Sequence, residues 1–165
     1  MDQKVEAAIR SMSLHKDKPV QEYKRFLTTE ICKLADSTLS YFATVNAAQI
    51  ELTMIGWSTS AMMLCTTIDK PLLYKLENTG LWGDAIREKK PVFTNDYKNS
   101  VKPTKKGTPQ GHVNIRRHLN LPIFENGKIV LVVGVGNKKE DYVEEDARNI
   151  EAFINNIWGD LKKKI

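Results

Sequence analysis

The sequence is poor in the residues from which disulfide frameworks and metal clusters are built. Its 165 residues include two cysteines, Cys32 and Cys65, and three histidines. No cysteines stand at the Cys-x-x-Cys spacing of thioredoxin motifs or zinc knuckles, and the Cys-x-x-Cys-His motif of c-type cytochromes is absent. We expect no structural disulfide, because the two cysteines lie on segments of different character.

A dinucleotide-binding loop is also missing. Gly134-Val-Gly136 is the nearest approach to one. The pair lies inside or at the end of an expected strand, and it lacks the third glycine and the following helix of the fingerprint. This excludes a Rossmann-type nucleotide site.

No run of apolar residues approaches the roughly 20 that a membrane-spanning helix needs. Residues 1–20 also lack the apolar stretch of a secretion signal. With 41% hydrophobic and 27% charged residues, the composition is that of a globular chain. Its length suits one domain with its own core. We therefore expect a cytoplasmic protein without membrane insertion.

The net charge of +5 raises the question of an anionic partner. Much of the excess comes from Lys102, Lys105 and Lys106 in a loop and from residues 162–164 at the C-terminus. No aromatic residues are interleaved with these lysines to stack on bases. Solvated lysine is the better interpretation, and we expect no nucleic acid partner.

Two segments show the spacing of amphipathic helices. Residues 20–38 and 142–165 carry apolar side chains at intervals of three and four, and acidic Glu144, Glu145 and Asp146 open the second segment. Residues 1–19 are partly helical in composition and are expected to form a helical lead-in or linker. The domain proper is then expected to span residues 20–165.

Between the two helices the pattern favours strands. Strands are expected at 41–46, 49–57, 71–76, 92–94, 118–124 and 128–135. Asn126-Gly127 supplies the positive φ angles of a tight hairpin turn. Residues 58–67 favour a short helix capped by Ser58 or Thr59, with a strand as the open alternative, and 79–89 favour a helix opened by Asn78 or Thr79. This order predicts an α+β domain with an antiparallel sheet and helices packed on it.

The segment 95–117 is a long loop with Pro103, Gly107, Pro109 and Gly111 and little apolar content. Loops of this length in a compact domain usually serve a function. We expect this one to cover a binding site.

Several short motifs accompany this pattern. They are Thr79-Gly-Leu-Trp-Gly83, Asn95-Asp-Tyr97, Lys105-Lys-Gly107, Gly111-His112, Leu121-Pro122 and Val133-Gly-Val-Gly-Asn-Lys138. In this order the chain resembles the GAF domains found in sensor histidine kinases of bacteria and archaea. The resemblance implies a central antiparallel sheet of about six strands, with the N- and C-terminal helices packed on one face and a ligand pocket between the sheet and its loops.

The resemblance also implies a role. The domain is expected to sense a small molecule and to relay occupancy through its terminal helices, which commonly pair two copies into a homodimer. It is not expected to be an enzyme itself, and its parent protein is expected to be a histidine kinase of a two-component system. GAF enzymes that reduce free methionine sulfoxide use several cysteines near the pocket, whereas this chain has two.

Some members of this subgroup carry haem, held by a pocket cysteine and a histidine in the long loop. Cys65 is the candidate for covalent attachment, and His112 is the candidate ligand of the haem iron. The alternative is that Cys65 is a small buried hydrophobe and His112 a loop hydrogen-bonder. A redox or gas sensor follows if haem is the ligand.

Further residues are candidates for ligand binding, each with a plainer alternative. Trp57, Met62, Met63 and Trp82 line an apolar cavity or simply fill the core. His118 ligates iron or is a half-exposed strand residue. Arg117 binds an anionic group or faces solvent. Asn95 and Asp96 present polar groups to a ligand or form a turn by themselves.

Three functions therefore stay open at this stage. The chain is a haem sensor, a GAF domain for another small molecule with Asn95 and Arg117 as polar anchors, or a dimerisation module without a ligand pocket. A ligand that binds two helix arrangements unequally would shift their populations.

Overall fold

The computed structural model describes residues 2–64, 72–108 and 110–165. Six antiparallel strands form one sheet in the order β3-β2-β1-β6-β5-β4. The expected α+β fold with a six-stranded sheet is confirmed. The strands are β1 Leu39–Val45, β2 Glu51–Trp57, β3 Leu73–Lys75, β4 Val92–Thr94, β5 His118–Glu125 and β6 Lys128–Gly136.

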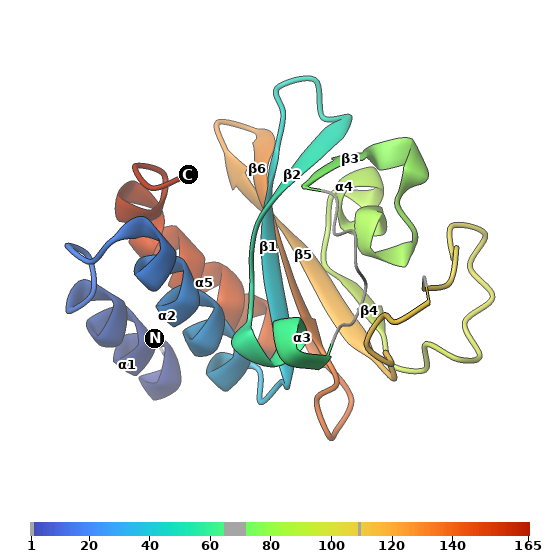
Figure 1. Cartoon of the computed structure of the whole chain (residues 1–165), viewed down its shortest axis with the longest axis horizontal. Helices are drawn as coiled ribbons and strands as arrows, with labels where there is room; N and C mark the ends of the chain where they lie inside the picture. Colours follow the sequence, from blue (N-terminus) through green and yellow to red (C-terminus); the bar gives the residue numbers. More distant parts are fainter. Residues whose placement is uncertain (1, 65–71, 109) are drawn as a thin grey trace.

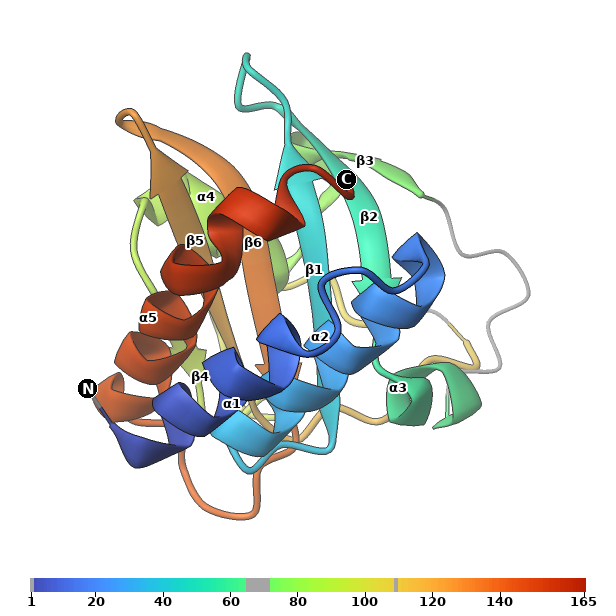
Figure 2. The same ribbon diagram turned by 90° about the vertical axis from the view of Figure 1, so that its left-hand side faces the viewer.

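The two faces of the sheet are covered differently. One face carries three long helices, α1 Gln3–Ser13, α2 Val20–Leu34 and α5 Glu144–Leu161 (Figures 1 and 2). The other side carries α3 Thr59–Leu64, the 3₁₀ turns η1 Leu76–Asn78 and η2 Leu81–Gly83, α4 Asp84–Glu88 and the long loop. None of the helices in the described ranges has the length and apolar character needed to cross a membrane.

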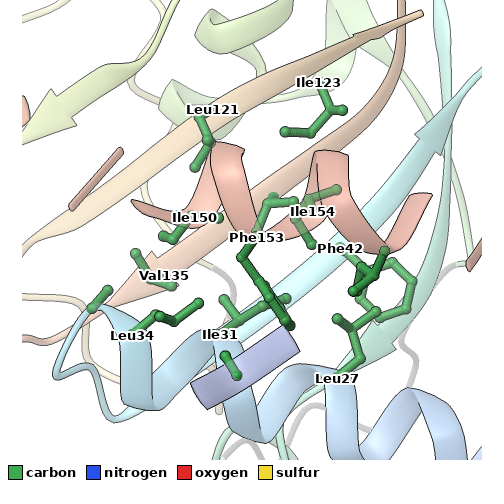
Figure 3. Packing of buried hydrophobic residues seen from close by; sticks show 14 of the residues in the cluster. Leu27, Ile31, Leu34, Phe42, Leu121, Ile123, Val135, Ile150, Phe153 and Ile154 are labelled. Carbon is green, nitrogen blue, oxygen red and sulfur yellow. The ribbon is translucent and has the colours of Figure 1, made fainter. Parts of the chain in front are cut away.

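The main core lies between the sheet and the three long helices. Leu27 and Ile31 of α2 meet Phe153 of α5 over Phe42 and Leu121 of the sheet, and all five are at most 1% exposed (Figure 3). Burying a large apolar side chain contributes roughly 1.5–3 kcal/mol each. The apolar residues spaced at three and four along α2 and α5 thus form the face of each helix that packs on the sheet.

Helix α1 belongs to the same core. Its side chains Val5, Ala8 and Met12 are at most 2% exposed and pack in one cluster with residues of α2 and α5. Figure 2 shows α1 lying across both of these helices. Helix α1 therefore contributes buried surface to the core, and the division of the chain at residue 20 stays a prediction.

Two local expectations are confirmed by backbone geometry. Asn126 and Gly127 have φ angles of 51° and 76° and close the β5–β6 hairpin. Ser58 Oγ accepts a 3.2 Å hydrogen bond from the backbone N–H of Ala61, so Ser58 caps α3.

The helix expected over residues 79–89 is wrong in its first half. The chain forms the turn η2 first, and α4 begins only at Asp84. The hydroxyl of Thr79 donates a 2.7 Å hydrogen bond to the carbonyl of Leu76, so it closes the preceding turn instead of capping a helix. A Cβ on Gly83 would lie 1.8 Å from Thr79 Oγ1, so this packing requires glycine.

Candidate functional site

A cavity of about 510 Å³ is lined by residues of the sheet, α3, η2 and the long loop. These helical segments and the loop lie on the side of the sheet opposite the three long helices (Figure 1). Volumes of this size are typical of small-molecule sites. The sheet contributes one wall, and α3, η2 and the long loop contribute the others. The lining includes Tyr41, Met54, Trp57, Ala61, Met62, Tyr74, Leu81, Trp82, Tyr97, His112, Ile115, His118 and Asn120.

Two glycines of the central strand β6 make room for this cavity. Gly134 pairs with Tyr41 of β1 and with Asn120 of β5, so the three residues form one row across the sheet. A Cβ on Gly134 would lie 1.9 Å from Tyr41 Cε1 and 2.6 Å from Asn120 Oδ1. Gly136 stands in the next row, beside His118. The missing side chain of Gly134 therefore leaves the space that Tyr41 and Asn120 fill on the floor of the cavity.

Tyr41, Asn120 and His118 form a hydrogen-bonded chain along this floor. Tyr41 Oη donates to Asn120 Oδ1 at 2.6 Å, and Asn120 Nδ2 lies 2.7 Å from His118 Nδ1. Burial lowers the pKa of His118 to about 4. The charge of Asp84 has a smaller effect that raises this pKa, and the charge of Lys102 has a smaller effect that lowers it. Burial also raises the pKa of Tyr41. Both side chains are therefore neutral at pH 7.

Aromatic side chains form one wall. The Trp82 ring lies edge-on to Tyr41 and Tyr74, with centroids 5.8 and 5.1 Å apart. Such perpendicular contacts are favourable and hold the rings in place. Trp57 and Trp82, both expected at a cavity, do line it. Their contact with a ligand stays a prediction.

The loop 95–117 is fastened to α4 by a buried carboxylate. Asp84 is 2% exposed, and its Oδ1 accepts a 2.7 Å bond from Arg87. Its Oδ2 accepts a 2.7 Å bond from Thr104 Oγ1 in the loop. Arg87 also donates to the carbonyls of Leu76 and Thr79. One ion pair thus holds the loop, α4 and the turn before Trp82 together.

Lysines of the loop are used internally. The Lys105 ammonium donates to the carbonyls of Tyr97, Lys98 and Ser100 at 2.7, 2.9 and 3.2 Å. It also lies 5.0 Å from the centre of the Tyr97 ring. The Lys106 ammonium donates to the carbonyl of Glu77 at 2.7 Å. These charges shape the cover of the cavity.

His118 is brought to the cavity in a buried position, whereas His112 lies at its exposed rim. The side chain of His118 is 8% exposed. His112 is exposed, and its Nδ1 lies 2.7 Å from the carbonyl oxygen of Val113. Cys65, the expected point of haem attachment, lies outside the described residues. Within the ranges that the structure describes, no group of three or more His, Cys, Asp or Glu side chains is placed to hold a metal ion.

Four expected ligand-binding residues lie elsewhere. Met63 is 78% exposed on α3, and its neighbour Met62 lines the cavity instead. Asn95 holds the start of α5, because its side chain exchanges two hydrogen bonds with the backbone of Tyr142 at 2.8 and 3.1 Å. Asp96 accepts hydrogen bonds from Asn99, which is the plain turn interpretation.

Arg117, the fourth, ties the start of β5 to the segment after β6. It donates to the carbonyls of Lys138 and Lys139 and lies 3.6 Å from the carboxylate of Asp141. With Asn95 and Asp96 it borders a separate polar hollow on the surface. The structure therefore gives Arg117 internal partners in place of a ligand in the cavity.

The sequence interpretation missed Tyr41, Asn120 and Gly134. Each is unremarkable alone, and only the sheet register brings them into one row. One signal was available: two glycines at alternate positions of a central strand leave two neighbouring places on one face without side chains.

Comparison with known proteins agrees with this architecture. A family model described as GAF domain matches residues 17–159. The methyl sulfide methyltransferase-associated sensor of Methanosarcina acetivorans is 41% identical over 145 residues, which cover 88% of this chain. The match covers 14% of that sensor's length.

Solved structures share the fold at low sequence identity. The GAF domain of an Acinetobacter phosphoenolpyruvate-protein phosphotransferase has a TM-score of 0.71 at 11% identity, covering 99% of this chain and 96% of its own. The free methionine-R-sulfoxide reductase of Neisseria meningitidis, solved with its substrate, has a TM-score of 0.68 at 12% identity, covering 99% and 93%. The family match, the 41% identical relative and the six-stranded sheet agree, and the chain belongs to the GAF domain family.

Proposed function

We propose that the chain is a ligand-sensing domain that binds a flat, largely apolar small molecule in the cavity. The observation that carries this proposal is the cavity itself, with its glycine floor and its wall of aromatic side chains. A wall of this kind excludes water and stacks on planar molecules. The cavity favours this proposal over a dimerisation module without a ligand pocket.

The relative from Methanosarcina acetivorans supports a sensory role, because it is called a sensor. We extend this to the finer proposal that the domain acts in the cytoplasm within a histidine kinase. The matched region is a small part of the relative, so the output domain is inferred only from the sequence resemblance. Autophosphorylation of the full gene product, with and without ligand, tests this step.

A route from the cavity to the helices is visible. Ser40 lines the cavity, and its hydroxyl donates a 2.7 Å hydrogen bond to the carbonyl of Thr28 in α2. The backbone N–H of Ser40 donates a hydrogen bond to Ser58 Oγ. Ser58 also caps α3, which forms part of the cavity wall. A ligand that displaced α3 or β1 would therefore act on α2. Its effect is limited to the difference in its affinity for the two states.

Haem is our finer proposal for the ligand. The cavity has apolar walls and two imidazoles, from His112 and His118, which suits a flat macrocycle with a central iron. His112 would hold the iron and Cys65 would attach to the edge of the macrocycle. Bound haem would supply a redox-active iron that binds small gases.

Haemin titration tests this assignment. Purified protein should develop a Soret band at a one-to-one ratio. His112→Ala should shift or abolish that band, whereas His15→Ala should not, because His15 follows α1 on the other side of the sheet. A haem mass that persists after denaturation, and is lost in Cys65→Ala, would support the covalent link. A missing Soret band contradicts the haem proposal.

A non-haem small molecule is the second candidate. The floor of the cavity carries the neutral hydrogen-bonding groups of Tyr41, Asn120 and His118. A metal-bound macrocycle does not require such groups, so they favour this second candidate. Mass spectrometry of the natively purified protein would identify a retained molecule. Pairing of two copies through the terminal helices is proposed in both cases, and light scattering measures it.

We further propose a non-catalytic role for the domain itself. The fold is shared with free methionine-R-sulfoxide reductases, but at 12% identity this likeness concerns the fold alone. The sequence has two cysteines, of which Cys32 lies on α2, under the other face of the sheet. An assay for reduction of free methionine sulfoxide should show no turnover.

A further inference from the structure

The hydrogen-bond chain on the cavity floor ends at Nε2 of His118, which has no hydrogen-bond partner among the residues that the structure describes. His118 is 8% exposed and its Nδ1 is occupied by Asn120. In the ranges that the structure describes, no residue forms a hydrogen bond with its Nε2. No fully buried side-chain nitrogen or oxygen of the described residues lacks a hydrogen-bond partner, so Nε2 is accessible from the cavity that His118 lines. Such an atom at a cavity marks the place where the polar group of a ligand fits.

The direction of the chain follows from its first member. Tyr41 has one hydroxyl proton, and Asn120 Oδ1 is its acceptor at 2.6 Å. If the hydroxyl accepted instead, its own proton would have no acceptor among the described residues. The amide of Asn120 is therefore oriented with its oxygen toward Tyr41 and its NH₂ toward His118.

This orientation fixes the histidine tautomer. The NH₂ group of Asn120 only donates, so His118 Nδ1 is an acceptor and carries no proton. A neutral imidazole with an accepting Nδ1 has its proton on Nε2. Burial lowers the pKa of His118 to about 4, so the ring is neutral near pH 7. The floor of the cavity thus presents one N–H donor.

The rest of the lining carries little charge. Lys106 is the only Asp, Glu, Lys or Arg among the described residues that border the cavity, and its ammonium is already bonded to the carbonyl of Glu77. A charged group deep in the cavity would lose its hydration without finding a counter-charge. An acceptor without charge suits the site.

We propose that His118 Nε2–H is the donor that recognises the ligand, and that the buried part of the ligand is an uncharged flat ring system with a hydrogen-bond acceptor. A carbonyl oxygen or an unprotonated ring nitrogen is the chemical class. This inference rests on the proposed function and deepens its second candidate, the non-haem small molecule. It also makes His118 a donor and not an iron ligand, since iron would need the Nε2 lone pair.

The tautomer is tested without any ligand. In protein labelled with ¹⁵N-histidine, two-dimensional NMR should show a proton on Nε2 of His118 and none on Nδ1. In Asn120→Asp the carboxylate can only accept, so Nδ1 should become protonated. A protonated Nδ1 in the unaltered protein overturns the inference, whatever binds in the cavity.

Ligand class is tested with a matched pair of probes, quinoline and naphthalene, which have the same shape and differ by one ring nitrogen. Binding is followed at pH 7.5 by the amide signals of Gly134 and Gly136. In His118→Phe the preference for quinoline over naphthalene, measured as the ratio of their dissociation constants, should fall about fivefold relative to the unaltered protein. This is the usual effect of one hydrogen bond.

A second variant is a control for the possibility that His118→Phe misfolds. Asn120→Leu keeps the histidine but removes the group that fixes its tautomer, and should lower the quinoline preference in the same direction. An unchanged ratio in the variants overturns the inference and leaves the proposed function intact. Failure of both probes to bind contradicts the proposed function and, with it, the ligand class.

Discussion

Thr104 Oγ1 donates a 2.7 Å hydrogen bond to Asp84 Oδ2, which joins the cover of the cavity to a carboxylate that is 2% exposed. The other oxygen of Asp84 is paired with Arg87 at 2.7 Å. A single side chain therefore holds both the long loop and the turn that positions Trp82. The stability of the loop and the shape of the cavity depend on the same ion pair.

Asp84→Ala is expected to lower the free energy of unfolding by about 3 kcal/mol, because it leaves the Arg87 guanidinium without its counter-charge. Urea denaturation measures the change. Thr104→Val is the matched control: it keeps the ion pair and loses one hydrogen bond, for a cost of about 1 kcal/mol. Equal effects of the two variants would contradict the central role of Asp84.

Gly134→Ala should disrupt the packing of Tyr41 and Asn120 on the cavity floor. The added methyl group would lie 1.9 Å from Tyr41 Cε1, so Tyr41 or Asn120 must move. We expect a loss of about 1–3 kcal/mol in unfolding free energy, together with weaker ligand binding.

Gly159→Ala is the control for this substitution. Gly159 lies in α5 and an added Cβ meets nothing within 4 Å. This change should stabilise the protein by about 0.5–1 kcal/mol, since alanine favours helix more than glycine does. If Gly134→Ala were equally harmless, the tight row across β1, β6 and β5 would be refuted.

The stability of the domain should fall on acidification. Burial lowers the pKa of His118 to about 4 in the folded state, from the ordinary histidine value of 6.5 that applies to the unfolded chain. Between these two values the unfolded chain binds more protons, so the contribution is present above pH 6.5 and is lost as pH falls toward 4. Its size is about 3 kcal/mol.

His118→Gln removes this contribution. Unfolding free energies of the two proteins, measured from about pH 7.5 to about pH 4.5, should converge as the pH falls. Asp84 and Lys102 act on the same ring with opposite signs, so the burial effect dominates. Parallel pH profiles would show that His118 does not carry the dependence.

Met12→Ala tests whether α1 is an integral part of the domain. The side chain is 1% exposed in the core shared with α2 and α5. Its truncation should cost about 2–5 kcal/mol in urea denaturation. Leu14→Ala, at a side chain that is 82% exposed, should stay within about 0.5 kcal/mol. A small effect at Met12 would mark the first helix as a detachable lead-in.

The fold was predictable where one element carries its own signal. The apolar stripes of α2 and α5 and the Asn126-Gly127 turn are local patterns, and the structure reproduces them. The prediction for residues 79–89 failed because local side-chain contacts decide the structure there: Gly83 packs on the hydroxyl of Thr79, which bonds the carbonyl of Leu76, and no helical period shows this.

The site was predictable in part. Trp57 and Trp82 are large apolar residues, of the kind that lines a cavity or fills a core, and both border the cavity. Asn95 and Arg117 carry polar groups that suit a ligand, yet these groups bond neighbouring backbone atoms. A sequence shows which groups can bond, but the partner is set by strand register and loop closure.

Lys105 gives the cover of the cavity an unusual property. Its ammonium gathers three carbonyl oxygens of one loop, as a sodium or calcium ion does in many other proteins. The loop thus carries its own built-in cation, and chelators or changes in metal supply leave its shape untouched. Acetylation of Lys105 would remove this charge, as chelation removes the ion from a metal-bound loop.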